Sequence, residues 1–153
     1  MGYEVREKDV PEMLVASVTR TASITTIGKE VQEAFATLME AIAPIGFGDG
    51  MPGTICLRLG DERSDGTWEI FLPVARRFDP PEGIEVKLHP AMHVAFATHV
   101  GRYDEVGRAH EAIDVWRREQ QRPMVGPPRE LYLNDPRETG EENAVTEVQV
   151  PIR

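Results

Sequence analysis

The sequence has one cysteine and no long apolar run, and each shortage excludes a class of protein. Cys56 has no second cysteine to pair with, so the 153-residue chain cannot hold an internal disulfide and fits a reducing compartment. No stretch is long and apolar enough to span a bilayer, and the first residues lack the apolar core of a signal peptide. We therefore expect a cytoplasmic protein with no membrane partner.

Positive charge is also scarce. The chain has 17 Lys and Arg residues against 26 Asp and Glu residues, and its formal net charge is −9. Phosphate recognition needs clustered Lys and Arg, so direct binding of nucleic acid is not expected. The acidic balance is compatible with a cationic ligand, although most acidic proteins are simply soluble.

Motifs for metals, cofactors and nucleophilic cysteines are missing. The chain has four histidines, but no HExxH sequence and no Cys pair. His93 and His99 lie six residues apart on one predicted strand, which separates them by roughly 20 Å, too far for one ion. The glycine-rich segment 46–50 follows a predicted helix instead of opening one, which makes it a poor phosphate cradle. We expect no metal and no cofactor.

The chain does contain an internal repeat. Met13–Thr19 resembles Met92–Thr98, which begins 79 residues later, and Trp68–Val74 resembles Thr146–Ile152, which begins 78 residues later. We predict a single domain over residues 1–153 built from two repeats, about 1–76 and about 84–153. A pseudo-twofold domain of this kind often has a ligand groove where its halves meet.

Each repeat has the pattern of a β-α-β-β unit. Apolar residues between Ile27 and Ile42 recur at helical spacing, and a second helix is predicted from a cap at Asp104 through Trp116. Alternation and β-branched residues predict the strands 13–19, 54–59, 67–75, 93–99, 130–134 and 144–152, with short extra strands at 3–10 and 84–88. Polar turns are predicted at 60–66 and 135–140.

The predicted fold class is therefore α+β. Duplicated β-α-β-β repeats would form a pseudo-twofold antiparallel sheet with two main helices on one face. The apolar rows of the strands should face the helices. The opposite face would then carry Glu69, Phe71, Glu130, Tyr132, Glu147 and Gln149.

The repeat is broken at one pair of positions. Pro52–Leu57 corresponds to Pro128–Leu133, so Thr54 and Cys56 correspond to Glu130 and Tyr132. Two small side chains in one repeat are replaced by an acid and an aromatic ring in the other. An acid beside aromatic rings can bind an organic cation through charge and cation–π contact.

The second half resembles the effector-binding domain of the GyrI-like family, also found in AraC-type and MerR-type multidrug-responsive transcription regulators of bacteria. The resemblance lies in Thr98–Tyr103, in Trp116, in Pro127–Pro136 with its sequence PPRELYLNDP, and in Thr146–Ile152. It is close from 92 to 152, and the first half departs more from a typical member.

The resemblance implies a duplicated, SHS2-type fold with an apolar pocket between the halves, in which Glu130 is the acid that faces cationic, lipophilic compounds. Together with the broken repeat, it indicates the ligand-binding residues Glu130, Tyr132, Trp68, Phe71, Cys56 and Tyr103. No helix-turn-helix precedes the domain, so a stand-alone, drug-sequestering protein is expected instead of a whole regulator.

Three functions are compatible with this pattern. The first is binding of an aromatic or cationic small molecule without turnover. The second is hydrolysis of small electrophilic xenobiotics, with Glu130 as general base beside Tyr132, as the family's hydrolases imply. The third is a protein-interaction module that contacts gyrase through an acidic surface, which the family's name implies.

Overall fold

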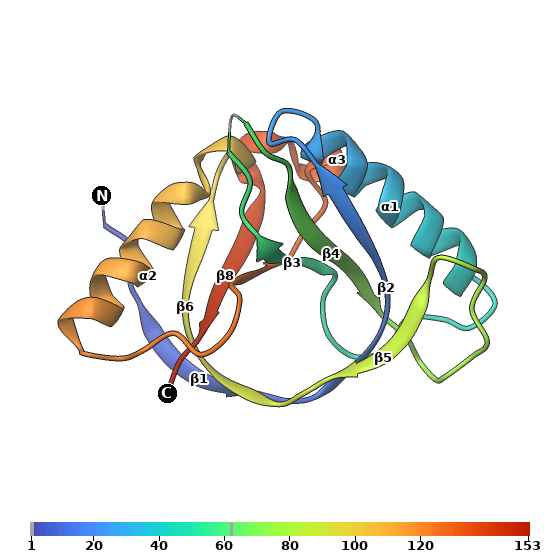
Figure 1. Cartoon of the computed structure of the whole chain (residues 1–153), viewed down its shortest axis with the longest axis horizontal. Coiled ribbons are helices and arrows are strands. Elements are labelled where there is room, and N and C mark those ends of the chain that lie inside the picture. Colours follow the sequence, from blue (N-terminus) through green and yellow to red (C-terminus); the bar gives the residue numbers. More distant parts are fainter. Residues whose placement is uncertain (1, 62) are drawn as a thin grey trace. The chain divides into compact units, whose positions relative to one another are not determined.

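The computed structural model describes residues 2–61 and 63–153, which form two compact units (Figure 1). Unit 1 combines the residues up to Pro11 with Ala91–Arg153, and unit 2 is Glu12–Pro90. The strand that opens each sequence repeat thus lies in the unit built mainly from the other repeat. The compact units and the sequence repeats therefore have different boundaries.

Unit 2 is a four-stranded antiparallel sheet with one helix on it. In chain order its elements are β2 (Met13–Ala22), α1 (Ile27–Ile42), β3 (Gly53–Arg58), β4 (Gly66–Pro73) and β5 (Glu85–His89). β2 pairs with β4 and β5, and β4 pairs with β3, so the order across the sheet is β3-β4-β2-β5. All three pairings are antiparallel, as the predicted α+β class requires.

Unit 1 has the same plan. Its elements are β1 (Arg6–Val10), β6 (Met92–Val100), the 3₁₀ helix η1 (Tyr103–Glu105), α2 (Gly107–Glu119), β7 (Arg129–Tyr132), α3 (Pro136–Thr139), the 3₁₀ helix η2 (Glu141–Asn143) and β8 (Val145–Pro151). β6 pairs with β1 and β8, and β8 pairs with β7, so the order is β7-β8-β6-β1.

The strand registers of the two units match position by position. Val15 lies opposite Pro73 in unit 2, and Val94 lies opposite Pro151 in unit 1. The same holds for the added strands: Val15 also pairs with Lys87, and Val94 pairs with Lys8. The correspondence predicted from the sequence repeat is therefore present in the backbone hydrogen bonding.

Each helix covers one face of its own sheet. In unit 2, Ala34, Leu38 and Ile42 of α1 pack on apolar residues of β2 and β4. In unit 1, Ala109 and Ile113 of α2 pack on apolar residues of β6 and β8. Burying a Leu or Ile side chain contributes about 1.5–3 kcal/mol, so these contacts hold each helix on its sheet.

Most predicted elements are confirmed, with two differences. The first helix has the predicted bounds. The second begins at Gly107, because Asp104 belongs to η1. The turn predicted at 135–140 is instead the short helix α3: Asp135 accepts a hydrogen bond from the Arg137 amide, and Pro136 opens the helix. Part of the turn predicted at 60–66, Glu62, lies outside the described residues.

Candidate functional site

Glu130 lies on the helix-covered face of the unit 1 sheet. In the β7–β8 pair, Glu130 is opposite Val148 and Tyr132 is opposite Thr146. Val148 belongs to the core cluster under α2. Because side chains alternate along a strand, Glu130 and Tyr132 face the same way as Val148, toward α2.

Four side chains meet there, and we call them the Glu130 quartet: Tyr103, His110, Glu130 and Tyr132. The hydroxyl groups of Tyr103 and Tyr132 both donate to Oε1 of Glu130, the second at 3.2 Å. Nε2 of His110 lies 2.6 Å from Oε2. The two tyrosine rings meet edge to face, with centroids 5.8 Å apart. Both carboxylate oxygens therefore have donors inside unit 1.

Local sequence brings Tyr103 and His110 to the carboxylate. Gly101 has φ +132°, a conformation that glycine adopts without strain, and it turns the chain at the end of β6. The 3₁₀ helix η1 then begins with Tyr103. His110 lies one turn after Val106 and one turn before Ile113, both buried, so its ring points toward the sheet.

The carboxylate is shielded while one tyrosine stays accessible. The side chain of Glu130 is 12% exposed, whereas Tyr103 exposes 49% of its surface. Burial of its hydroxyl end, with Tyr132 and the negative charge of Glu130 beside it, raises the pKa of Tyr103 well above its ordinary value. Tyr103 is therefore a neutral phenol that donates its proton, and Glu130 supplies the negative charge.

The prediction that Glu130 and Tyr132 share a face with Glu69, Phe71, Glu147 and Gln149 is wrong. In β7 the residue opposite Glu147 is Leu131, and the residue opposite Gln149 is Arg129. The carboxylates of the two rows therefore lie on opposite faces of the sheet. The apolar Leu131 and Leu133 were expected under the helix, but in this strand the polar row faces α2.

The face away from the helices has its own polar groups, and they pair with one another. In unit 2, Glu69 is 4% exposed and bonds Nζ of Lys87 and, at 2.5 Å, Nε2 of His89. In unit 1, Nζ of Lys8 lies 2.9 Å from Glu147 at the matching place. Burial raises the pKa of Glu69, but the hydrogen bonds from His89 and Lys87 together lower it by more. The pKa of Glu69 is therefore below its ordinary value.

Three of the predicted ligand-binding residues lie in unit 2. Trp68 and Cys56 face each other across the β3–β4 pair, and Trp68 packs against the core under α1. Phe71 is fully buried, is of the opposite parity to Trp68, and contacts the His89 ring at 4.8 Å. Trp68 and Phe71 thus face opposite sides of the sheet. The ligand-binding role of the three residues stays a prediction, as does the groove at the junction of the repeats.

The histidines are engaged in other contacts. Nε2 of His99 lies 2.8 Å from the Arg102 carbonyl, which can only accept, so Nδ1 of a neutral ring accepts from the Tyr3 hydroxyl at 2.7 Å. His93 lies between Glu7 and Asp9. Within the described residues, no group of three His, Cys, Asp or Glu side chains is arranged to hold a metal ion.

His110 is the member of the quartet that the sequence reading missed. A signal was present, because His110 lies among the positions of α2 that face the sheet, where an ionisable side chain needs a polar partner.

No helix among the described residues is long and apolar enough to cross a membrane.

Comparison with known proteins agrees with this architecture. The model of the family described as "GyrI-like small molecule binding domain" matches residues 3–153. No curated protein matches the chain. Several solved structures share the fold of this chain at low sequence identity.

Four of these structures are informative. The C-terminal domain of EcmrR has 19% identity and a TM-score of 0.88, with 100% of this chain and 99% of that chain covered. In the EcmrR–DNA complex the match covers 99% of this chain but only 57% of that chain. A hydrolase from Listeria innocua has 17% identity and a TM-score of 0.72, covering 99% and 93%. SAV2435 bound to tetraphenylphosphonium has 14% identity and a TM-score of 0.70, covering 100% and 94%.

Proposed function

The chain belongs to the GyrI-like family of small-molecule-binding domains, and from this premise we propose that its Glu130 quartet binds hydrophobic organic cations. The observation that carries the proposal is a shielded carboxylate held between two tyrosine side chains. The similar fold of SAV2435, whose structure contains tetraphenylphosphonium, supports a ligand of this chemistry.

The physical basis is a charge in a partly dry, aromatic surrounding. An opposite charge near a shielded carboxylate is attracted more strongly than in water, because the effective dielectric constant is lower. The faces of Tyr103 and Tyr132 attract cations as well. Both phenols are neutral donors, so they orient Glu130 without cancelling its charge. A neutral His110 ring does the same, whereas a protonated ring would repel a cationic ligand.

The test is a comparison of a cation with a neutral molecule of similar shape. Tetraphenylphosphonium and triphenylphosphine oxide would be titrated calorimetrically into the unsubstituted protein, Glu130→Gln and the control Glu138→Gln, whose side chain is exposed on α3. We expect Glu130→Gln to weaken binding of the cation about tenfold or more, equivalent to about 1.4 kcal/mol, and to change the neutral ligand's affinity little. Equal losses for both ligands would refute a counter-ion role.

The residues Trp68, Phe71 and Cys56 can be tested separately. The chain has two tryptophans, Trp68 and Trp116, so in a Trp116→Phe variant the fluorescence comes from Trp68 alone. A ligand that stacks near Trp68 should quench this fluorescence with the affinity measured calorimetrically. Saturating ligand without a change in the spectrum would remove Trp68 from the proposed site.

A hydrolase is the second candidate function. It is favoured by the hydrogen-bonded cluster of a carboxylate, an imidazole and two phenols, and by the similar fold of the Listeria innocua hydrolase. Glu130 would act as general base and Tyr132 would orient the substrate. The donors on both oxygens of Glu130 would first have to yield to a water molecule, so we rank binding ahead of turnover.

Single-turnover incubation separates the two functions. An excess of protein would be mixed with a panel of reactive electrophiles, including epoxides, and the products would be followed by mass spectrometry. Unchanged electrophiles would eliminate the hydrolase hypothesis, and turnover that Glu130→Gln abolishes would establish it.

Retention of gyrase on the immobilised protein would test the third hypothesis. The stand-alone role and the cytoplasmic location stay predictions.

A further inference from the structure

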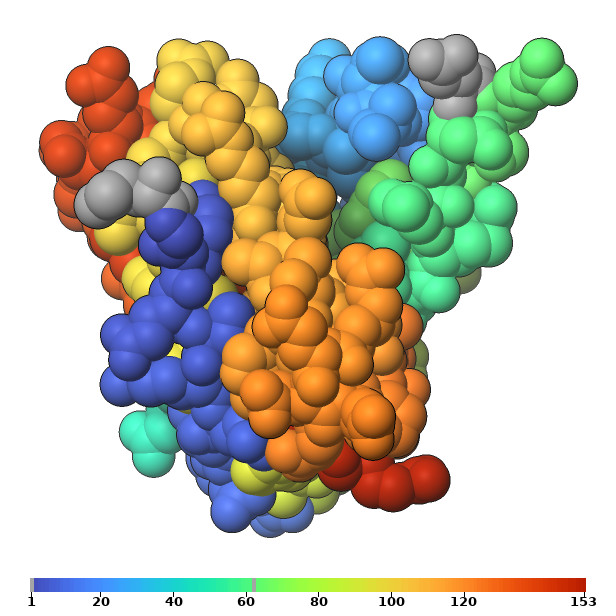
Figure 2. Space-filling view, turned by 90° about the vertical axis from the view of Figure 1, so that its left-hand side faces the viewer, coloured from blue at the N-terminus to red at the C-terminus, as the bar shows by residue number. Residues whose placement is uncertain are grey.

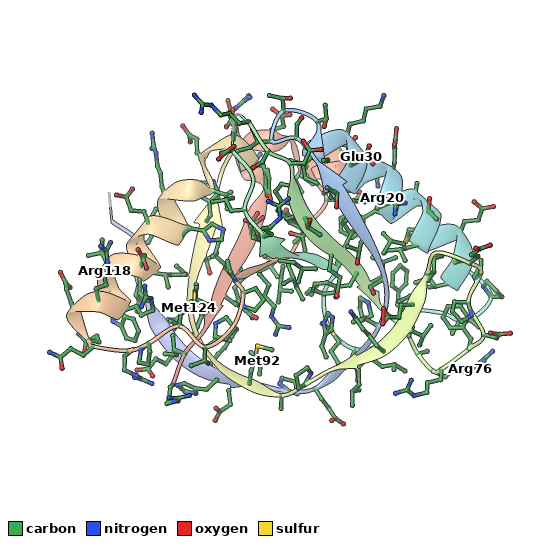
Figure 3. All side chains as sticks on the ribbon, in the orientation of Figure 1. Arg20, Glu30, Arg76, Met92, Arg118 and Met124 are labelled. Carbon is green, nitrogen blue, oxygen red and sulfur yellow. The ribbon has the colours of Figure 1, made fainter. Side chains whose placement is uncertain are left out.

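Two adjoining surface pockets of unit 1 lie between α2 and the segment that follows it. The larger has a volume of about 460 Å³, and its lining combines the apolar Ile113, Met124 and Val150 with the carboxylates of Glu111 and Asp114. The smaller, of about 310 Å³, is lined by Arg117, Arg118, Gln121, Arg122 and Pro123. Figure 2 faces α2 in orange, and Figure 3 labels Arg118 on α2 and Met124 on the following segment. The pockets share Arg117 and Arg118.

The end of α2 creates this arrangement. Gln121 has φ +55°, the left-handed conformation that closes a Schellman motif. The Arg122 amide donates to the Arg117 carbonyl at 2.9 Å, and the Gln121 amide donates to the Arg118 carbonyl at 3.2 Å. The chain therefore folds back so that Arg122 lies beside Arg117. The two carbonyls that would otherwise repel an anion already accept hydrogen bonds.

The smaller pocket concentrates positive charge. Among the described residues, three guanidinium groups line it and no carboxylate does. Asp114, which lines the larger pocket, pairs with Arg117 and Arg118, and Glu7 pairs with Arg122, so two of the three charges are compensated. The local excess of positive charge contrasts with the net charge of −9 on the whole chain.

Arg117 is held in place, and each of its terminal nitrogens carries an N–H group beyond the one used in its bond. Its two terminal nitrogens donate to Asp114 at 2.5 Å and to the Arg122 carbonyl at 3.4 Å. Its Nε atom is buried and has no hydrogen-bond partner among the described residues. An arginine whose plane is already fixed loses little freedom when it binds an anion, and a guanidinium has five N–H groups in all.

We propose that the two pockets form one binding site for an amphipathic organic anion. Its carboxylate, sulfonate or phosphate lies at Arg117, Arg118 and Arg122, and its apolar body lies over Met124 and Val150 in the larger pocket. The site goes beyond the cation-binding function proposed for Glu130. The two sites meet only at His110, which bonds Glu130 and also lines the larger pocket.

The test uses three probes with the same ten-carbon chain: decanoate, decanol and decyltrimethylammonium. Binding would be followed by calorimetry and by NMR, in which the Arg117 Nε–H signal is a direct reporter. We expect decanoate to bind more tightly than the other two and to shift this signal. The double substitution Arg117→Gln/Arg118→Gln should weaken decanoate binding at least tenfold and leave decanol unchanged. The matched control is Arg108→Gln, because Arg108 is exposed on the same helix and pairs with Glu105 outside both pockets.

Two further measurements keep the outcome decisive. Met124→Asp changes an exposed side chain in the larger pocket, so it should preserve the fold and weaken decanoate. Arg117→Gln/Arg118→Gln should leave tetraphenylphosphonium binding unchanged, because neither arginine belongs to the Glu130 quartet, and this separates failure at this site from failure of the proposed cation function. The proposal is overturned if decanol binds as tightly as decanoate, or if the arginine substitutions do not affect decanoate affinity.

Discussion

The two units repeat one backbone plan but differ in which polar groups they keep. On the face away from the helices both units retain a lysine–glutamate pair, Lys8–Glu147 in unit 1 and Lys87–Glu69 in unit 2. The quartet of unit 1 has no charged or aromatic side chain at the matching places of unit 2. By the sequence repeat, its four positions correspond to Ile24, Val31, Thr54 and Cys56.

This difference distinguishes polar groups that stabilise the fold from polar groups that serve ligand binding. A pair found in both units is needed wherever this sheet forms, since each lysine ties an outer strand to the strand β4 or β8 two places away. A cluster found in one unit cannot be a requirement of the fold. We therefore expect the repeated pairs to affect stability and the quartet to affect ligand binding.

The largest expected effect is on stability. Glu69→Ala and Glu147→Ala should each lower the free energy of unfolding by about 2–4 kcal/mol, because each leaves a partly buried cation without its partner. The side chains of Lys8 and Lys87 are 37% and 34% exposed, and this contact with water moderates the cost. Glu130→Gln should change it by less than about 1 kcal/mol, since the amide oxygen still accepts a hydrogen bond. Urea unfolding would measure all three. A stability loss confined to Glu130→Gln would reverse the assignment.

The second prediction removes the difference between the units. Glu130→Thr/Tyr132→Cys gives unit 1 the residues that unit 2 has at the matching places. Loss of the carboxylate and one ring should weaken tetraphenylphosphonium binding by about 10–100-fold. Calorimetric titration checks this, with the exposed Glu142→Thr as control. Undiminished affinity in the double variant would place the ligand elsewhere.

A smaller effect concerns how each main helix ends. The chain leaves α1 through Gly46 at φ +93°, whereas it leaves α2 through Gln121 at φ +55°. A side chain in the left-handed region costs about 1–2 kcal/mol, so Gln121→Gly should stabilise the protein by up to about 1 kcal/mol after the added flexibility of the unfolded chain is counted. Gly46→Gln should destabilise it by a similar amount. Thermal unfolding of both variants would show the opposite signs.

The smallest effect is a pH dependence of one outer strand. In unit 1, Nδ1 of His93 bonds Asp9 and Nε2 bonds Glu7, so both nitrogens must carry protons and the ring is charged. The register places Leu14 opposite Leu88 at the matching place in unit 2, where no charge is involved. Loss of attachment as the pH rises should therefore be confined to β1, whereas acidification also protonates Glu69, the partner of Lys87 and His89 in β5.

The direction follows from the two pKa shifts. Hydrogen bonds to Glu7 and Asp9 raise the pKa of His93 above 6.5, so its contribution is present below pH 6.5 and is lost as the pH rises through the raised value. Hydrogen bonds from His93 and Arg122 lower the pKa of Glu7 below 4.5, so its contribution is present above pH 4.5 and is lost on acidification. Amide exchange of β1, corrected for intrinsic rates, should be slowest between these values. An equal acceleration of exchange in β5 as the pH rises would contradict the comparison.

The sequence predicted much of this fold because its signals are local. The spacing of apolar residues from Ile27 to Ile42 depends only on helical geometry, and the structure confirms both bounds. The internal repeat predicted two equivalent sets of strands, which share one register. Asp135–Pro136 shows the limit: a cap followed by proline starts a helix, and the turn prediction overlooked this signal.

The site was predicted in part. The broken repeat indicated Glu130 and Tyr132, and the family resemblance added Tyr103; the structure brings these three together. His110 was not predicted as part of the site, because its partner Glu130 lies twenty residues away along the chain. The face of Glu130 was also assigned wrongly, because alternation says which residues share a face but not which row a helix covers.

The sequence by itself determined the element types, the twofold repetition and the position at which the repeats diverge. These properties follow from side-chain periodicity and chain stiffness within a few residues. Only the tertiary structure decided that β1 and β5 each pair in the other repeat's sheet, that the polar row of β7 faces α2, and that four side chains converge on one carboxylate. The physical reason is that pairing partners and covered faces depend on packing between segments far apart in the chain.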